Sequence, residues 1–481
     1  MKWVIFGLLS GLLGGIAGIA FTVSLKFSIE FFLDLVNQAR SQGLLFMVAL
    51  IPFAGGLAVG LLNYLLDKDA FYIPCSTDGM IELVHLHHGY TNPGKGVLKI
   101  LTASLTIGTG GSAGRECPMA YSGSAVAAAI NLFFKKTWLG RFMKFTRRDA
   151  KIVAICGAAG ALGGIFSAPL GGGIFASEVL YSEDVEVEAL PSALISSVVG
   201  FLLFNSLLGS EPLVTFPKFH DMLILNPNVA YSLFHVAGMA LLGLVSVIAA
   251  ALWTKIFYAF HYPIRDSKIP RPLRPAIGGL LDGLVVLLGL LMLGELYLWG
   301  MGYWVIQETI DFTELLNSFG HLLIWVFLLL YFGKILASTF SIASAGAGGV
   351  IVPSLFCGAM IGGAYALALD ALFPEFIVRS GAHVAYIVAG MAALYAAAGR
   401  VPMSTILLLC ETCSNFSLFA PMLIASMISF LVAKRLNITI YPSQLTRRPG
   451  LTRRKRFLDL LLWFIVILIG TALYFSTGIV L

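Results

Sequence analysis

The sequence predicts an all-α integral membrane protein, folded as an inverted-repeat bundle of tilted and broken helices. Three observations lead to this fold class. Only 12% of the 481 residues are charged and 58% are hydrophobic, with a mean hydropathy of +0.90, whereas a soluble globular protein has roughly 25% charged residues. Apolar runs long enough to cross a bilayer alternate with shorter runs that are broken by Gly and Pro. This broken pattern also occurs twice along the chain.

The long apolar runs predict the complete transmembrane helices, since a helix needs about 20 apolar residues to cross the hydrocarbon core. They cover residues 3–36, 45–66, 190–208, 230–258, 275–300, 320–340 and 457–480. The last run follows a basic segment and predicts an additional C-terminal transmembrane helix. We therefore divide the chain into a membrane domain over 1–446 and a basic linker with the extra helix over 447–481. The first run is too long for the core of a signal peptide, so no cleavable signal peptide is expected.

The shorter apolar pieces predict helices that are interrupted within the membrane. They cover residues 97–109, 118–134, 152–165, 170–181, 351–369, 383–397, 402–413 and 419–434. Broken helices at membrane depth are tolerated only where they are buried in protein or line a cavity. Such helices are therefore a pointer to a transport site.

The two halves of the chain share one pattern, which predicts internal repeats over about 50–210 and 275–440. The segment "CGAAGALGGIFSAPLGGGIFASEVL" in the first half resembles "AGMAALYAAAGRVPMSTILLLCETC" in the second, and in each a Pro lies nine residues before a Glu. This duplication is typical of transporters whose substrate binds at the interface of inverted repeats. The equivalent glutamates, Glu178 and Glu411, are expected to cap or tie neighbouring backbone rather than to take part in transport.

The charged residues and cysteines exclude several classes of function. The net charge of +6 is concentrated in basic loops at 135–151, 265–274 and 447–456, which are expected to be cytoplasmic. No folded basic domain is present, so a nucleic-acid partner is not expected. The six cysteines show no disulfide or zinc-finger spacing, and we expect no cofactor. Glu82, His85 and His88 have a helical spacing that could hold a metal, but we favour solvated histidines and expect no metal site.

The segment "GGSAGRECP" (110–118) has two competing interpretations. Residues 110–114 match the G-x-S-x-G elbow of a serine hydrolase with Ser112 as nucleophile. However, the flanking sequence is helical in pattern, and the nearest preceding histidine, His88, lies 24 residues away. The other interpretation is an anion site, because a helix start in the membrane exposes backbone N–H groups. We favour the anion site and expect no enzyme.

Glu116 is the candidate functional residue of this segment, because a carboxylate at bilayer depth is costly and usually marks a functional site. It precedes Pro118 at the first turn of an apolar helix, where the helix dipole favours a negative charge. Glu116 and a bound anion would compete for the same N–H groups, which makes Glu116 a gate. The competing interpretation is a structural acid paired with Arg115.

Four motifs and one tyrosine resemble those of the CLC family of chloride channels and proton-coupled chloride exchangers. "GRECP" (114–118) resembles the family's G-R/K-E-G-P motif, and "GVIVP" (349–353) resembles its G-x-F-x-P motif. "FSAPLGGGIFASE" and "ETCSNFSLFAPML" resemble its two segments with conserved glutamates. Tyr441 resembles the tyrosine that reaches the central anion. The resemblance covers about residues 50 to 445 and indicates a divergent prokaryotic-type member without regulatory domains.

The resemblance implies gated transport of a small inorganic anion, with chloride favoured, through a multi-pass protein of a prokaryotic inner or plasma membrane. It also implies a homodimer in the lipid bilayer with one anion pathway per subunit. We expect three helix-start breaks to converge on one anion site opposite Tyr441. By resemblance, Glu116 is the gate and the anion-binding residues are Thr77, Asp78, Gly79, Gly114, Arg115, Gly349, Val350, Ile351 and Tyr441.

Two departures from the family pattern affect the function. Asp78 stands where a serine hydroxyl normally binds the central anion, and a fixed negative charge beside an anion is unfavourable. Three explanations stay open. Asp78 points away from the anion or is protonated, Ser76 or Thr77 binds the anion in its place, or the substrate is not simply chloride. Val179 stands where exchangers carry a proton-transferring glutamate, which favours channel-like, weakly proton-coupled flux. The alternative is a proton-coupled antiporter for chloride, fluoride or another small anion, with the acidic loop 182–188 supplying substitute proton donors.

Overall fold

The chain folds into a bundle of helices of very different lengths. The computed structural model describes residues 2–209, 214–215, 229–311, 313–373, 377 and 381–448. Within these residues there are 18 α-helices and no β-strand. The α-helices of the first half are α1 (Lys2–Ser41), α2 (Met47–Leu66), α3 (Ser76–His85), α4 (Gly94–Gly108), α5 (Glu116–Lys136), α6 (Trp138–Phe142), α7 (Arg147–Ile165), α8 (Pro169–Glu178) and α9 (Leu190–Leu208).

The second half contains a further nine α-helices among the described residues. Its α-helices are α10 (Val229–Asp266), α11 (Leu273–Leu293), α12 (Tyr303–Asp311), α13 (Thr313–Phe319), α14 (Leu323–Ala343), α15 (Ile351–Leu372), α16 (His383–Gly399), α17 (Pro402–Thr412) and α18 (Phe419–Arg435). Three short 3₁₀ turns lie at Lys68–Phe71, Gly320–Leu322 and Phe416–Leu418. The extra helix expected over 457–480 lies outside the described residues.

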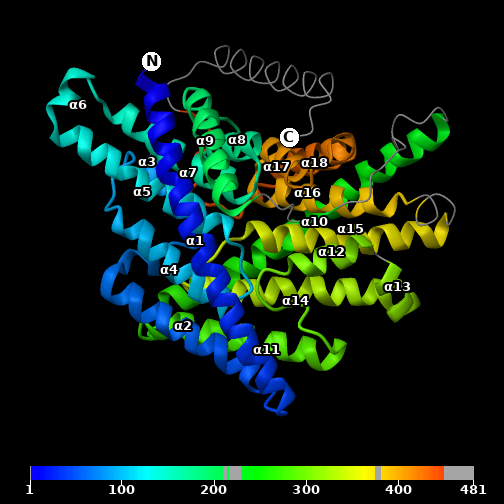
Figure 1. Ribbon diagram of the computed structural model, residues 1–481. Coiled ribbons are helices and arrows are strands. Elements are labelled where there is room, and N and C mark those ends of the chain that lie inside the picture. Colours follow the sequence, from blue (N-terminus) through cyan, green and yellow to red (C-terminus); the bar gives the residue numbers. More distant parts are fainter. Residues whose placement is uncertain are drawn as a thin grey trace.

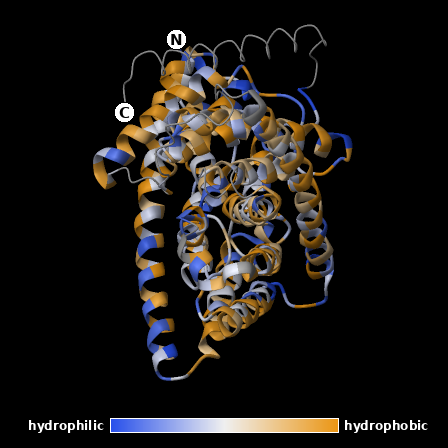
Figure 2. Ribbon diagram, turned by 90° about the vertical axis from the view of Figure 1, so that its right-hand side faces the viewer, coloured by the Kyte–Doolittle hydropathy of each residue, from blue (hydrophilic) through white to orange (hydrophobic). Residues whose placement is uncertain are grey.

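The protein is a multi-pass integral membrane protein. Nine helices among the described residues are long and apolar enough to cross a membrane. Hydrophobic residues run along most of the helices in Figure 2. Several of the apolar side chains that are more than half exposed belong to these long helices, as expected where they face lipid: examples are Leu65, Leu202, Ile248 and Leu288. The predicted fold class is therefore confirmed.

The two halves use the same helix packing. In the first half, α1 packs on α4, α5, α7 and α9, and α5 packs on α7. In the second half, α10 packs on α14, α15, α16 and α18, and α15 packs on α16. The halves meet where α2 packs on α11 and where α8 packs on α17. Figure 1 shows α2 and α11 together at one end of the bundle, and α8 and α17 together near the other end.

Small residues allow the central helices of each half to approach closely. A Cβ atom on Gly157 of α7 would collide with the carbonyl oxygen of Gly123 on α5, and the reverse is also true. In the second half, a Cβ atom on Gly358 of α15 would meet the carbonyl oxygen of Gly390 on α16. Small residues of this kind replace the hydrophobic driving force between helices in a membrane.

The two equivalent glutamates each cap a helix of the other repeat. The carboxylate of Glu178 accepts hydrogen bonds from the backbone N–H groups of Met403 and Ser404, at 3.2 and 2.8 Å, at the start of α17. The carboxylate of Glu411 accepts from the N–H groups of residues 170 and 171, at 3.0 and 2.7 Å, at the start of α8. These N–H groups have no partner within their own helices. The predicted capping of neighbouring backbone by both glutamates is therefore confirmed.

Candidate functional site

Three helix starts from both repeats meet in the interior. The backbone N–H of Gly114 donates to the carbonyl oxygen of Gly349 at 2.8 Å, so the two glycine-rich breaks pair directly. The hydroxyl of Ser76, the first residue of α3, donates to the carbonyl oxygen of Gly348 at 3.1 Å. The predicted convergence of the breaks at 77–79, 114–116 and 349–351 is therefore confirmed.

Each predicted anion-binding residue on these breaks lies at or near a helix start. Arg115 and Val350 are the N-cap residues of α5 and α15, and Ile351 is the first residue of α15. Gly79 lies inside α3, where an added Cβ would stand 3.1 Å from the ring of Tyr121. Backbone N–H groups at helix starts are free to bind an anion. The fold thus collects several such groups in one place.

Tyr441 pairs with a second tyrosine in the interior of the bundle. Its side chain is fully buried, and its hydroxyl lies 2.9 Å from that of Tyr395 on α16. The segment after it is tied to both repeats, because the side-chain amide of Gln444 donates to the carbonyl oxygens of Val179 and Gly399, each at 3.0 Å. The two tyrosine hydroxyls form a polar pair inside an otherwise apolar core.

Asp78 points toward the segment that follows Tyr441. One carboxylate oxygen accepts from the backbone N–H of Ser443 at 3.1 Å, and the other accepts from the thiol of Cys75 at 3.3 Å. Thr77 differs, because its buried hydroxyl has no hydrogen-bond partner among the described residues. It lies beside the thiol of Cys117, which is also close to the N–H groups of Val350 and Ile351. Of the alternatives for this position, the geometry favours an engaged Asp78 and an available Thr77 hydroxyl.

Glu116 is the first residue of α5 and is fully buried. Its Oε1 atom accepts a hydrogen bond of 2.6 Å from the hydroxyl of Tyr303 and lies 3.5 Å from Nε of Arg115. Its Oε2 atom has no partner among the described residues and is directed toward Gly114, where an added Cβ would lie 2.8 Å from it. The Arg115 guanidinium also donates to the carbonyl oxygen of Ile165 at 3.3 Å. Glu116 therefore has one bonded oxygen and one oxygen at the paired breaks.

Val179 leaves the end of α8 without a titratable side chain. It is fully buried as the C-cap residue of α8. The acidic loop 182–188 lies nearby but is bonded to the C-terminal segment, since Glu183 pairs with Arg447 and Lys434, and Asp184 pairs with Arg448. Burial acts to raise the pKa of Glu183, but these two cations outweigh it and hold the pKa below its usual value. Glu183 is therefore held as an ionised anchor.

The other chemistries considered for this chain find no support in the described residues. Ser112 is buried and its hydroxyl has no hydrogen-bond partner there, so no base activates it as a nucleophile. No group of three His, Cys, Asp or Glu residues within the described ranges could hold a metal ion. His85 lies 3.0 Å from the carbonyl oxygen of Leu180, and Glu82 accepts from the hydroxyl of Ser443 at 3.0 Å. His85 and Glu82, two residues of the candidate metal site, thus have separate hydrogen-bond partners.

The sequence analysis missed Tyr303 and two buried charges near the glycine-rich break at 110–116, which we call the first break. Asp282 of α11 is fully buried and accepts a hydrogen bond of 3.1 Å from the backbone N–H of Ser112. Lys334 of α14 is fully buried and donates to the carbonyl oxygen of Gly300 at 2.7 Å. Both interrupt long apolar runs, and a charge in such a run is itself a signal of function. Tyr303 carries no comparable signal in the sequence.

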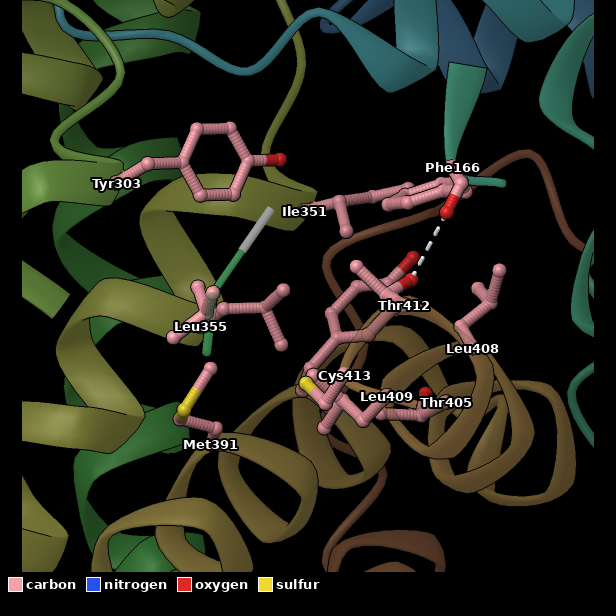
Figure 3. Close-up of a pocket in the computed structure, with 12 residues that line it drawn as sticks. Phe166, Tyr303, Ile351, Leu355, Met391, Thr405, Leu408, Leu409, Thr412 and Cys413 are labelled. Carbon is pink, nitrogen blue, oxygen red and sulfur yellow. Dashed lines mark hydrogen bonds between the residues drawn. The ribbon is translucent and has the colours of Figure 1, made fainter. Parts of the chain in front are cut away.

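A small, mostly apolar cavity of about 20 Å³ has Tyr303 and Tyr395 among its lining residues. Tyr303, Ile351 and Phe166 lie on one side of it in Figure 3, while Leu355, Met391 and residues of α17 lie on the other. A space of this size holds at most about one water molecule. The region beside the paired breaks is therefore tightly packed and largely excludes water.

Comparison with known proteins relates this chain to one family. The family model described as "Voltage gated chloride channel" matches residues 55–434. The voltage-gated ClC-type chloride channel ClcB of Escherichia coli is 27% identical over 391 residues, which cover 81% of this chain and 84% of that protein. A slow cyanobacterial Cl⁻/H⁺ antiporter has a similar structure, with a TM-score of 0.73 and 21% identity over 92% of this chain and 96% of the other. A CLC-type fluoride/proton antiporter has a TM-score of 0.70 and 19% identity over 93% and 98%.

Proposed function

Because this chain belongs to the CLC family of voltage-gated chloride channels and transports anions across the membrane, we propose that chloride is its main substrate and that the pathway passes through the paired breaks. One observation carries this proposal. The N–H of Gly114 and the carbonyl of Gly349 join two helix starts beside Glu116, so the free N–H groups of both repeats face one small volume. Transport rather than enzymatic chemistry is the proposed role of this arrangement.

The anion would be held mainly by backbone N–H groups and hydroxyls. We assign the inner part of the site to Thr77, Val350, Ile351 and Tyr441. The outer part comprises Gly114, Arg115 and Gly349. Neutral donors at helix starts suit an anion that must also leave, because they attract negative charge without a full opposing charge. Asp78 and Gly79 shape the start of α3 in this scheme, with the Asp78 carboxylate bonded to Ser443.

Glu116 is proposed as the gate of this pathway. Its free Oε2 atom is directed toward Gly114, beside the start of α5, where a negative charge and a transported anion would compete for the N–H groups of the first turn. When ionised, the carboxylate blocks the outer part of the site. When protonated, it loses its attraction for the N–H groups and leaves room for the anion. The pairing with Arg115 at 3.5 Å is compatible with this role, since Arg115 also bonds Ile165.

A homodimer is proposed on the basis of the face formed by α8 and α17. The carboxylate of Glu411 is partly exposed on this face, and its bond to the N–H of Leu170 is open to the surface. A carboxylate and a helix start exposed to lipid are costly. A second copy that covers this face would remove the cost. The bilayer and a second copy of the chain are thus the proposed partners.

The proposed mode of transport is channel-like, with weak proton coupling, because Val179 provides no proton acceptor at the end of α8. A second candidate function, proton-coupled antiport of chloride, fluoride or another small anion, is favoured by a different contact. Ser443 bonds both the partly exposed Glu82, through its hydroxyl, and the buried Asp78, through its N–H, which joins two carboxylates between the surface and the site. Two solved proteins with this fold are described as proton antiporters.

Anion flux and proton flux measured together test the proposal. The purified protein would be reconstituted in liposomes with a chloride gradient, and chloride efflux and internal pH would be recorded at the same time. We expect chloride efflux with little proton movement. A fixed ratio of protons to chloride ions would establish the antiporter instead, and efflux of fluoride but not of chloride would change the assigned substrate.

A further inference from the structure

We propose that Tyr303 is a positioning residue for Glu116: its hydroxyl holds the carboxylate in the blocking position and thereby sets the pH at which the pathway opens. This inference rests on the proposed function of Glu116 as the gate. Tyr303 belongs to α12, outside all of the motifs that identify the family in this chain. It is nevertheless the residue that makes the shortest contact with the Glu116 carboxylate among those described here.

One side chain of α12 contacts both charges of the first break. The hydroxyl of Tyr303 donates to Oε1 of Glu116 at 2.6 Å, a length typical of strong bonds from a hydroxyl to a carboxylate. The guanidinium of Arg115 lies over the ring of Tyr303, 5.8 Å from its centroid, within the range of a cation–π interaction. Tyr303 therefore stabilises the ionised form of Glu116 in its present position.

The backbone before Tyr303 is fixed from two directions. We call residues 294–302, which connect α11 to α12, the strap. The N–H of Gly300 donates to the carbonyl oxygen of Gly110 at 2.9 Å, and the carbonyl oxygen of Gly300 accepts from Nζ of Lys334 at 2.7 Å. Lys334 is fully buried, and a buried cation in a membrane helix requires such a partner. These bonds hold the start of α12 against the first break.

The repeat architecture gives α12 the place that α3 has in the first half. Helix α3 packs on α5 and α7, and α12 packs on the counterparts α15 and α16. The start of α3 bonds the glycine-rich break at 344–351, through Ser76 and Gly348. The strap before α12 bonds the first break, through Gly300 and Gly110. Because α3 carries the proposed anion residues on the inner side, its counterpart is well placed to carry a residue that acts on the outer side.

The contact has a defined effect on the pH dependence. The titratable and charged groups that face Glu116 are Arg115 and Cys117 from its own segment and Tyr303 from α12, while Cys75 and Asp78 of α3 lie on the Cys117 side. A hydroxyl that donates to a carboxylate favours the ionised form. Loss of this bond would allow Glu116 to accept a proton at a higher pH. The free energy of a hydrogen bond to a charged group is large enough to shift the half-activation pH by about one unit.

The variant Tyr303→Phe tests the proposal, because it removes only the hydroxyl. Chloride efflux from liposomes would be measured across pH for the wild type and the variant. We expect the half-activation pH to rise by about one unit, with severalfold more flux than the wild type at neutral pH. Tyr297→Phe is the matched control, since Tyr297 lies on the strap and stacks on Trp304 with ring centroids 5.2 Å apart. The control should keep the wild-type profile.

The same substitution in a Glu116→Gln background separates this proposal from the gate itself. If Tyr303 acts through Glu116, the double variant behaves as Glu116→Gln alone. An unchanged pH profile in Tyr303→Phe, together with an altered one in Glu116→Gln, would overturn the role of Tyr303 and leave the gate intact. An unaltered pH profile in Glu116→Gln would overturn the gate.

Incorporation of 3-fluorotyrosine at position 303 provides a second test that preserves the fold. The fluorine makes the phenol a stronger hydrogen-bond donor without removing the hydroxyl. We expect the half-activation pH to fall, opposite to the effect of Tyr303→Phe. A rise, or no shift, would contradict the proposal.

Discussion

At the scale of single residues, we propose that Glu116 determines whether the pathway conducts. Replacing it with Gln removes the charge and nearly keeps the shape, so the site should resemble the protonated, open state. We expect flux in Glu116→Gln to persist or rise and to lose its pH dependence, whereas wild-type flux should increase on acidification because protonation weakens the hold of the carboxylate on the N–H groups. Liposome efflux at several pH values measures both. Misfolding of the variant would instead indicate a structural partner of Arg115, whose buried cation would be left uncompensated.

Two neighbouring residues of α3 should affect anion binding in opposite directions. Thr77 offers a buried hydroxyl beside Cys117, so Thr77→Val should weaken chloride binding by roughly threefold to tenfold, the value of one hydrogen bond. Asp78→Asn removes a negative charge and keeps an acceptor for the N–H of Ser443, so it should strengthen binding. Calorimetric titration with chloride measures both effects. Weaker binding in Asp78→Asn would show that the carboxylate supports the site rather than opposes the anion.

At the scale of elements, the reciprocal caps join the two repeats. Glu178 satisfies the start of α17 and Glu411 satisfies the start of α8. Glu178→Gln and Glu411→Gln should each lower the stability of the folded protein by about 1–2 kcal/mol, because a neutral amide is a weaker acceptor for helix-start N–H groups. Thermal unfolding in detergent checks this, with the exposed Glu30→Gln on α1 as control. Normal stability with lost flux would assign the glutamates to transport instead.

At the scale of the whole molecule, each subunit should conduct by itself. The proposed site lies between helix starts of the same chain, where Gly114 bonds Gly349 and Tyr303 bonds Glu116. A linked dimer of one wild-type and one Glu116→Gln subunit should therefore show the average of the two pH profiles. Efflux from liposomes with at most one dimer per vesicle measures this. If the pH profile of the linked dimer matched that of only one of its two subunit types, the pathway would be shared between subunits.

The sequence determined the class of molecule and much of the site. Low charge, long apolar runs and Gly-Pro breaks are local properties of the chain, so they predicted the membrane fold, the repeat and the helix start at Glu116 without coordinates. The helix starts were recognisable because Pro118 lies in the first turn of α5, and Pro169 and Pro402 begin α8 and α17. Unpaired N–H groups follow from such a start whatever surrounds it.

Only the tertiary structure decided which side chains meet at the site. The bond between Tyr303 and Glu116 joins residues 187 positions apart, and that between Ser443 and Asp78 joins residues 365 positions apart. The sequence left the direction of Asp78 open, because a buried carboxylate bonds whichever donor the packing brings within reach. The same holds for the partners of Glu178 and Glu411 on the opposite repeat. Local pattern sets where a helix begins, but the packing of distant helices decides what each helix start contacts, since hydrogen bonds act only over about 3 Å.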